Sequence, residues 1–262
     1  MEKELADRLR GASKEERRHL YTAVYDELFR RVPHHQQLAL KVSPQQRLAD
    51  IAKEVEMLRP FLGGDSTFLE IGPGDCALSL EVAKSVRQVY AVDVSTEITK
   101  GIDAPANFRL AFSDGCSVPV PPGSVDVAYS TDLIEHLHPD DAFEQLRNVH
   151  GALAPGGRYL CVTPNGISGP HDISMYFDKV ATGFHLKEYT VAGLCELFRR
   201  AGFSRIRVVL GARGRFAALP ALPSILCESL LDVIPHRLRR PVAGLLPFRL
   251  LLMQKIRLVG IK

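Results

Sequence analysis

Phe68-Leu69-Glu70-Ile71-Gly72-Pro73-Gly74-Asp75-Cys76 joins two kinds of sequence pattern. The apolar run before Gly72 is typical of a buried strand, and residues 77–83 have the apolar spacing of a helix. Glycine is required in such a turn because it adopts a positive φ freely and lets a ligand approach the backbone. Asp93 follows 19 residues after Gly74, where a carboxylate can accept hydrogen bonds from both hydroxyls of a ribose. The sequence therefore predicts a nucleoside-cofactor site at this turn.

The charges around the turn distinguish two classes of cofactor. Gly72-x-Gly74-x-x-Ala77 also fits a variant of the dinucleotide pattern, but a dinucleotide would bring a pyrophosphate to this position. The carboxylates of Glu70 and Asp75 repel such an anion, whereas they favour the sulfonium and ammonium groups of S-adenosyl-L-methionine. We therefore expect S-adenosyl-L-methionine as the cofactor.

Further motifs follow this turn in a fixed order. They are the segments 107–115, 118–119, 123–130, 135–137, 153–160 and 163–165. Across roughly residues 65 to 210 the succession resembles the class I S-adenosylmethionine-dependent methyltransferases. Cys76 departs from the family pattern, which often has a third glycine at this position.

The resemblance implies an α/β, Rossmann-like fold in which helices cover both faces of a seven-stranded, mostly parallel sheet. Its last two strands are expected to pair antiparallel, as in the resembling family. Thr190 is a helix-start signal, and Gly202 suits the end of the same helix. The strands are expected near residues 67–71, 88–92, 107–111, 125–130, 157–163, 205–210 and 255–261. We divide the chain into an N-terminal helical cap at residues 1–62 and a methyltransferase domain at 63–262.

Two helix-start signals lie in the N-terminal cap. Ser13-x-x-Glu16 is a capping box before an amphipathic run that reaches Phe29, and Ser43-Pro44 starts a second helix. In the resembling family such helices cover the substrate side of the cofactor pocket. The alternative is a helical flank that only packs on the core.

The resemblance also assigns the cofactor contacts. Asp93 is expected to hold the ribose hydroxyls, and Asp114 to accept from the adenine amino group beside Gly115, which leaves room at the backbone. Ser130, at the end of the fourth strand, is expected to offer its main-chain carbonyl to the ammonium group. The alternative for Asp93 and Asp114 is a helix cap or a turn. The methionine end is expected to lie against Glu70, Gly72 and Gly74.

A second group of polar residues follows the fourth strand, at the edge where open α/β sheets bind ligands. If residues 132–136 are helical, Asp132, Glu135 and His136 share one face. With His185 as the fourth ligand, these side chains predict a site for a divalent metal, Mg²⁺ or Mn²⁺. The set resembles that of the metal-dependent O-methyltransferases, although those have glutamate where this chain has Asp132.

A metal-free interpretation stays open at the same residues. Glu-His-Leu also follows the fourth strand in methyltransferases without a metal, where both polar residues are structural or contact the cofactor. His136 or His185 would then be the general base, because histidine titrates near neutral pH. His171, in a loop beside Asp172, is a further candidate for a catalytic base or a substrate contact, and the alternative is a surface pair.

Composition and charge limit the environment of the chain. The chain opens with mixed charges, and no apolar run in its 262 residues is long enough to span a membrane. Its five cysteines have no C-x-x-C spacing and suit reduced, buried thiols, so we expect a cytoplasmic protein. The basic residues are not interleaved with aromatic ones and tryptophan is absent, so we expect no nucleic-acid partner.

An insertion at residues 212–254 separates the last two strands, where the family often has a short turn. Its length predicts short helices rather than a bare loop. Residues 205–262 carry nine Arg and two Lys against Glu228 and Asp232, which gives a charge of +9. Apolar residues with basic neighbours leave three interpretations of 216–253: a dimer contact, a substrate lid, or a peripheral membrane contact. Of these, we expect a homodimer.

The residues together predict an S-adenosylmethionine-dependent O-methyltransferase assisted by a divalent metal. We expect its acceptor to be a small molecule or saccharide, with the methyl group going to a hydroxyl of a sugar or polyol. The first alternative is a metal-independent methyltransferase that acts on a quinone, a lipid or another small molecule. The second is a non-catalytic cofactor-binding partner of another protein.

Overall fold

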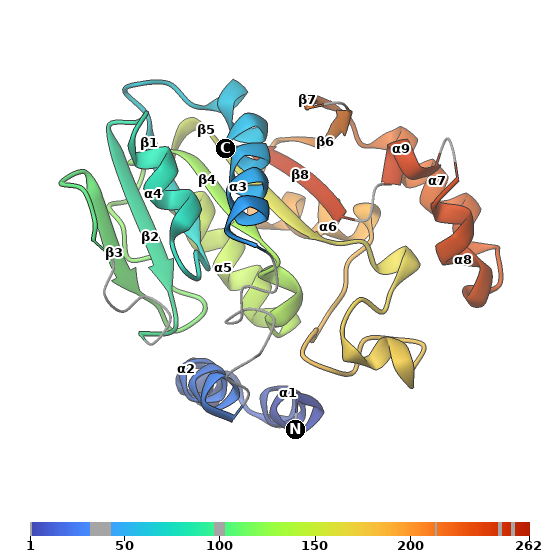
Figure 1. Cartoon of the computed structure of the whole chain (residues 1–262). Coiled ribbons are helices and arrows are strands. Elements are labelled where there is room, and N and C mark those ends of the chain that lie inside the picture. Colours follow the sequence, from blue (N-terminus) through green and yellow to red (C-terminus); the bar gives the residue numbers. More distant parts are fainter. Residues whose placement is uncertain (1, 32–42, 97–102, 213, 246–247, 253–254) are drawn as a thin grey trace.

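The computed structural model describes residues 2–31, 43–96, 103–212, 214–245, 248–252 and 255–262. The part of the predicted cap at 32–42 and three short pieces of the predicted insertion lie outside these residues. Five parallel strands form one half of a single sheet (Figure 1). They are β1 (Thr67–Ile71), β2 (Gln88–Asp93), β3 (Phe108–Phe112), β4 (Val125–Thr131) and β5 (Leu153–Pro164).

The other half of the sheet is antiparallel. The strand order is β3-β2-β1-β4-β5-β8-β6-β7, and β8 lies antiparallel to both β5 and β6. All seven predicted strands are present, and the last two of them pair antiparallel as expected. An eighth strand, β7, forms a hairpin with β6 at the edge of the sheet. These strands are β6 (Arg205–Ala212), β7 (Arg215–Pro220) and β8 (Lys255–Ile261).

Helices cover both faces of the sheet, which explains why every residue of β1 is buried. One face packs against α3 (Pro44–Leu58) and α4 (Ala77–Ala83). The opposite face packs against α5 (Pro139–Ala152) and α6 (Val191–Ala201). The five cysteines are free and buried, as the sequence predicts.

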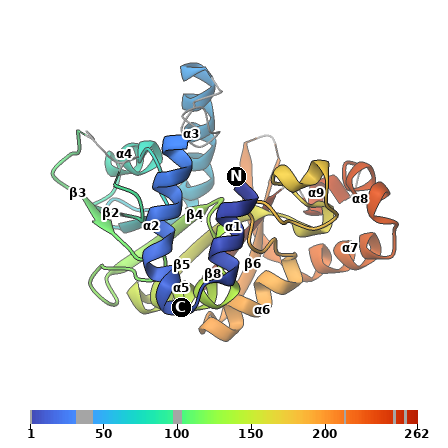
Figure 2. The same ribbon diagram turned by 90° about the horizontal axis from the view of Figure 1, so that it is seen from below.

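Two further helices, α1 (Glu2–Gly11) and α2 (Lys14–Arg31), cross the edge where the parallel strands end (Figure 2). Ser13 and Glu16 form the predicted capping box: the Glu16 amide donates to Ser13 Oγ, and the Ser13 amide donates to Glu16 Oε2. A buried ion pair joins Arg17 of α2 to Asp141 of α5, with 2.5 Å between Nε and Oδ2. The Tyr21 hydroxyl donates to the same carboxylate over 2.7 Å. These contacts fix α2 on the body of the protein.

The other predicted helix signals are also confirmed. Ser43 Oγ accepts from the Gln46 amide at the start of α3. Thr190 caps α6 in the same way, and Gly202 ends that helix with a φ of 108°.

The insertion is mainly helical beyond β7, in agreement with the prediction. It contains α7 (Leu222–Asp232), α8 (His236–Ala243) and α9 (Phe248–Leu252). Cys227, Leu231 and Leu252 of the insertion form a small apolar cluster. Ile167, from the loop after β5, packs in the same cluster. No helix among the described residues is long and apolar enough to cross a membrane.

Candidate active site

The turn between β1 and α4 has the backbone that the sequence predicts. Gly72 and Gly74 adopt φ values of 68° and 56°. A Cβ atom on Gly72 would lie 3.0 Å from Leu133 Cδ1, so a side chain at this position would push against its neighbour. Cys76 keeps the left-handed conformation, with a φ of 58°, at the position where the family often has glycine. The departure at Cys76 therefore leaves the turn intact.

Asp93 reaches this turn from the end of β2. Its Oδ2 accepts from the Gly74 amide at 3.2 Å, and its Oδ1 accepts from the Ser95 amide at 2.9 Å. Burial raises the pKa of Asp93, although the main-chain N–H groups of Ser95 and Gly74 oppose this shift. Because an ionised carboxylate has about four acceptor positions, these two bonds leave Asp93 able to accept from a ribose diol.

Glu70 lies buried beneath the same turn. The Ser79 hydroxyl of α4 donates to Glu70 Oε2 over 2.5 Å, and burial raises the pKa of Glu70 to about 8. A cation bound beside this carboxyl group would favour its charged form. The second acidic residue of the turn, Asp75, is exposed and forms an ion pair with Arg47 of α3.

Asp114 and Gly115 follow β3, where the sequence predicts the adenine contacts. Asp114 Oδ1 accepts from the amides of Cys116 and Ser117. Burial acts to raise the pKa of Asp114, but these main-chain N–H groups outweigh it and leave the pKa lowered. A Cβ atom on Gly115 would lie 2.6 Å from Cδ2 of Tyr21, so the room at Gly115 is taken by the cap helix α2. The Oδ2 atom of Asp114 faces Arg18 of α2 at 3.5 Å.

Ser130 is fully buried near the end of β4. Its hydroxyl forms a 2.7 Å hydrogen bond with the Tyr159 hydroxyl of β5. The side chain is thus used inside the sheet, and the proposed role of its main-chain carbonyl stays a prediction.

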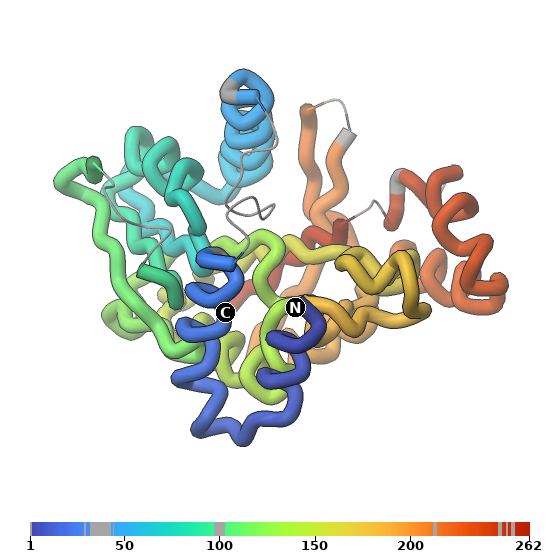
Figure 3. Tube along the Cα trace, turned by 60° about the horizontal axis from the view of Figure 1, so that its bottom comes forward, coloured from blue at the N-terminus to red at the C-terminus, as the bar shows by residue number. Residues whose placement is uncertain are grey.

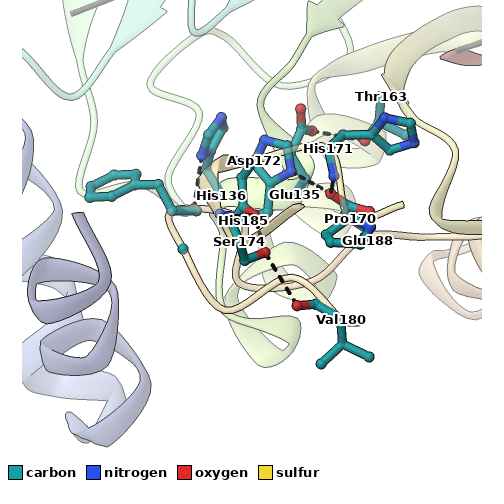
Figure 4. Close-up of polar contacts among 12 residues, drawn as sticks. Glu135, His136, Thr163, Pro170, His171, Asp172, Ser174, Val180, His185 and Glu188 are labelled. Carbon is teal, nitrogen blue, oxygen red and sulfur yellow. Dashed lines mark hydrogen bonds and ion pairs between the residues drawn. The ribbon is translucent and has the colours of Figure 1, made fainter. Parts of the chain in front are cut away.

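Three of the four predicted metal ligands come together beside this cofactor region (Figure 4). Glu135 and His136 lie on the short 3₁₀ helix η2 (Ile134–His136), and His185 lies in the loop before α6. One ligand atom from each of the three lies within 4.8 Å of the others. All three side chains are buried, and Glu135 has no exposed surface. We call these three residues the Glu-His-His cluster.

Neighbouring groups orient both imidazole rings. His136 Nδ1 lies 3.0 Å from the Phe184 carbonyl oxygen, which can only accept, so this nitrogen carries the proton. His185 Nδ1 lies 2.7 Å from Glu188 Oε1, and a carboxylate there favours the same tautomer. The two Nε2 atoms are therefore the ones that remain for a metal or a substrate.

The remaining acceptor of the cluster is an oxygen of Glu135. The Thr163 hydroxyl donates to Oε2 over 2.8 Å, and Oε1 is buried without a hydrogen-bond partner among the described residues. A buried polar atom without a partner is unfavourable unless a ligand satisfies it. Two histidine nitrogens and one such oxygen fit the donor set of a divalent transition metal.

Burial and neighbouring charges shift the pKa values of the three cluster residues in different directions. Burial raises the pKa of Glu135 to about 8, with a further contribution from the charge of Asp132. Burial and the neighbouring His185 lower the pKa of His136 to about 4. Burial also acts to lower the pKa of His185, but its hydrogen bond to Glu188 and the charge of Glu135 raise the pKa overall. A cation bound at the cluster would favour the charged form of Glu135.

The helical face predicted for residues 132–136 is wrong. Asp132 has a φ of 49°, and η2 begins only at Ile134, so Asp132 does not share a face with Glu135 and His136. Its Oδ2 forms an ion pair with Lys255 of β8. Asp132 is therefore not part of the Glu-His-His cluster, although its charge acts on Glu135.

His171 lies in the loop that packs against the cluster. Its Nε2 is 2.9 Å from the Asn165 carbonyl oxygen, and its amide donates to Glu188 Oε1 over 2.6 Å. The same Glu188 oxygen contacts His185 Nδ1. The structure thus gives His171 a place in the support of His185, and a catalytic role for His171 stays a prediction.

Two cap residues of this site have no signal in the sequence. The Tyr25 ring of α2 packs edge-on against Phe184, with 5.3 Å between ring centroids, and lies 6.4 Å from the His136 ring. Burial and the charges of Glu135 and Asp93 raise the pKa of Tyr25. Arg10 of α1 donates to the main-chain oxygens of residues 182, 183 and 185.

Comparison with known proteins agrees with this architecture. A probable S-adenosylmethionine-dependent methyltransferase of Mycolicibacterium smegmatis is 30% identical over 136 residues, which are 52% of this chain and 51% of that protein. The match thus spans about half the length of this relative. Phosphoethanolamine N-methyltransferase 2 of Haemonchus contortus, solved with S-adenosyl-L-methionine, has a TM-score of 0.55 at 20% identity and covers 84% of this chain and 53% of its own.

An S-adenosylmethionine-dependent methyltransferase of Archaeoglobus fulgidus has the same fold over most of its length. Its TM-score is 0.55 at 20% identity, and the likeness covers 81% of this chain and 94% of that one. A family model described as a methyltransferase domain matches residues 44–208, from the start of α3 into β6. This match includes the turn at Gly72, Asp93 and the whole Glu-His-His cluster. The chain therefore belongs to the methyltransferase domain family, and its fold is that of the class I S-adenosylmethionine-dependent enzymes.

Proposed function

We propose that this protein transfers the methyl group of S-adenosyl-L-methionine to a hydroxyl oxygen of a small acceptor, with a divalent cation held by the Glu-His-His cluster. The observation that carries the proposal is the buried Glu135 Oε1 beside two histidines whose Nδ1 atoms are already engaged. Membership of the methyltransferase family indicates S-adenosyl-L-methionine as the methyl donor. The glycine turn and Asp93 support its binding.

The acceptor we propose is a sugar or polyol with neighbouring hydroxyls, free or within a saccharide. A bound cation would lower the pKa of such a hydroxyl so that its proton is lost near neutral pH. In this mechanism Asp93 would bind the ribose and the Glu-His-His cluster would hold the cation. Tyr25 would lie between these two parts of the site. Holding the acceptor oxygen in line with the sulfonium supplies much of the rate.

The donor set distinguishes between the two predicted metals. Mg²⁺ takes oxygen ligands almost only, whereas two imidazoles and one carboxylate are a ligand set of transition metals, and Mn²⁺ is the transition metal of the two. We therefore propose Mn²⁺ rather than Mg²⁺ as the better activator.

A metal-free mechanism is the second candidate, and one observation favours it. His185 contacts Glu188 through Nδ1 and has a raised pKa, which is the arrangement of a general base held by a carboxylate. The acceptor in that case need not have neighbouring hydroxyls, and quinones, lipids and other small molecules stay candidates.

One experiment separates the two mechanisms. The protein is stripped with EDTA, and Mn²⁺ binding is followed by electron paramagnetic resonance for the wild type, Glu135→Gln, His136→Ala and His185→Ala. His19→Ala, an exposed histidine of α2, is the control. We expect the three cluster variants to lose Mn²⁺ binding while S-adenosyl-L-methionine affinity, measured by calorimetry, stays near wild type.

Turnover with a panel of vicinal diols should disappear in EDTA and return with Mn²⁺. Full turnover in EDTA, or equal Mn²⁺ binding by the wild type and all three variants, would contradict the metal-assisted mechanism. Loss of turnover in His185→Ala under metal-free conditions would then support the general-base mechanism.

A further inference from the structure

Helix α7 presents an apolar face to solvent. Leu222, Leu226, Leu230 and Val233 follow one another at helical spacing and are between 56% and 83% exposed. The opposite face of the helix is already used, because Cys227 and Leu231 pack in the cluster enclosed by the insertion. Nothing among the described residues covers the outer face, and an apolar surface of this kind marks a contact site.

A second group of exposed apolar side chains lies on the turn at residues 173–180. Tyr176 is 80% exposed, and its neighbours in this group are mostly about half exposed. The group consists of Ile173, Met175, Tyr176, Phe177 and Val180. The turn lies at the same end of the molecule as α7–α9 (Figures 1 and 3). A hydrogen bond from Arg240 of α8 to the Pro170 carbonyl oxygen, 3.3 Å long, joins α8 to the loop just before this turn.

Basic side chains accompany these apolar groups. The described insertion helices carry Arg237, Arg239, Arg240 and Arg249, and their only acidic residues are Glu228 and Asp232. Glu228 is buried and accepts from the main-chain N–H groups at the start of α6. Asp232 is paired with Arg239 over 2.8 Å. Glu228 is therefore covered and Asp232 is neutralised, so exposed arginines such as Arg237 and Arg249 set the charge of the insertion helices.

We infer that the outer face of α7, the arginines of α8 and α9, and the 173–180 turn form a docking surface for an anionic lipid bilayer. Exposed leucine and aromatic side chains beside arginines match the requirements of a helix that lies in the interface of such a bilayer. Arginine contributes an apolar stem as well as a charge, so it suits the boundary between lipid and water. Tyr176 likewise has an apolar ring and a polar end.

Charge favours the bilayer over a second copy of this chain. Two copies that met through this surface would bring like-charged arginines together, whereas anionic head groups complement them. The surface is also joined to the site, because Asp172 accepts from the amide of Ser174 within the turn and from the amide of His185. A docked turn would thus lie beside the loop that carries His185, whatever the acceptor is.

Sedimentation with vesicles tests this inference without reference to activity. The full chain is mixed with vesicles of phosphatidylcholine alone or of phosphatidylcholine containing phosphatidylglycerol. We expect binding to the anionic vesicles, a decrease as salt is added, and about tenfold weaker binding to neutral vesicles. Equal binding to both vesicle types, or none to either, would overturn the inference.

Three double variants locate the surface. Leu226→Ser with Leu230→Ser changes α7, Tyr176→Ser with Phe177→Ser changes the turn, and Arg237→Glu with Arg249→Glu reverses the charge. Each should weaken binding to the anionic vesicles about tenfold or more. All the changed side chains are exposed, and an unchanged melting temperature will show that the variants fold.

The matched controls lie on α3 and at its end, away from the insertion helices α7, α8 and α9 (Figure 1). Leu48→Ser changes a leucine that is 66% exposed, and Arg59→Glu changes an arginine with an exposed side chain. Both should bind vesicles like the wild type. If the controls lose as much binding as the double variants, the surface is wrongly placed. If the wild type dimerises and only the α7 variant becomes monomeric, with vesicle binding unchanged, the face is a self-association site and the inference fails.

Discussion

The guanidinium group of Arg10 donates to the main-chain oxygen of His185 over 3.0 Å. The same group donates to the main-chain oxygens of Thr182 and Gly183 at 3.0 and 3.1 Å. Three carbonyl groups of one loop are therefore held by a single side chain of α1. Because His185 belongs to the Glu-His-His cluster, the N-terminal cap takes part in the geometry of the site rather than only covering the core.

Replacing Arg10 by alanine should lower turnover more than it lowers cofactor affinity. Hydrogen bonds to a charged group each contribute roughly 1.5–3 kcal/mol, so losing them should loosen the His185 loop and lower kcat about tenfold or more. Steady-state kinetics and calorimetry with S-adenosyl-L-methionine measure the two quantities. Arg8→Ala is the control, because Arg8 is in the same helix and pairs only with Glu27 among the described contacts. Equal kinetics for the two variants would remove Arg10 from the support of the site.

The substitution Asp93→Ala should weaken S-adenosyl-L-methionine binding by about 1.5–3 kcal/mol, the range for hydrogen bonds to a charged acceptor. Calorimetry measures the affinity, and Asp103→Ala, an exposed aspartate before β3, is the control. Asp93 also accepts from the Gly74 amide, so the melting temperature of the variant shows whether the turn survives. Unchanged affinity in a folded Asp93 variant would exclude the ribose contact.

Stability of the ligand-free protein should fall as the pH rises from about 6.5 to 8. The pKa of Glu70 is raised to about 8 in the folded protein, so the folded state holds a proton that the unfolded state has already released. The stability that Glu70 contributes is fully present below the pKa of Glu70 in the unfolded state. It is lost as the pH rises through the pKa of Glu70 in the folded state. Glu135 acts in the same direction, while His136, with its pKa lowered to about 4, acts oppositely and only below about pH 6.5.

Glu70→Gln isolates the contribution of Glu70, because glutamine keeps the size of the side chain and does not titrate. We expect the pH-dependent loss of unfolding free energy between pH 6.5 and 8 to shrink by up to about 2 kcal/mol. Denaturant titrations at the two pH values measure this difference. If the unfolding free energy of the wild type and that of the variant change equally between the two pH values, Glu70 does not titrate in this range.

Gly115→Ala should destabilise the protein, because the added methyl group would clash with Tyr21 of the cap helix α2. The residue has a φ of 90°, and the new Cβ would lie 2.6 Å from Tyr21 Cδ2. Gly123→Ala is the matched control: its φ is 67°, but no atom lies within 4 Å of the added Cβ. Both variants carry backbone strain of about 1–2 kcal/mol, and only Gly115→Ala adds the clash, so its melting temperature should fall further. Equal melting temperatures would show that Tyr21 moves aside without cost.

The parts of the site that were predictable are local in the sequence. The turn at Gly72 and Gly74 and its distance to Asp93 follow from strand and turn patterns within 30 residues. The prediction that Glu135, His136 and His185 lie close together followed from the family resemblance. Sequence could not reveal the left-handed backbone of Asp132, because a non-glycine residue with positive φ carries no pattern.

Most of the other features that were not predicted from the sequence depend on contacts between distant parts of the chain. Arg10 and His185 are 175 residues apart, and no periodicity links a guanidinium group to a carbonyl oxygen of a distant loop. Tyr25 looks like any apolar residue of an amphipathic helix. Strand β7 was missed because it is a short edge strand that ends at Pro220, within a stretch where leucines suggest helix.

The position of β8 between β5 and β6 has a consequence for synthesis of the chain on the ribosome. The order of the sheet gives β6 no contact with β5 except through β8, whose partners run from Lys255 to Ile261. The five parallel strands can therefore assemble while the rest of the chain is still being translated. The hairpin of β6 and β7 can form locally, but it can join the sheet only after β8 has left the exit tunnel.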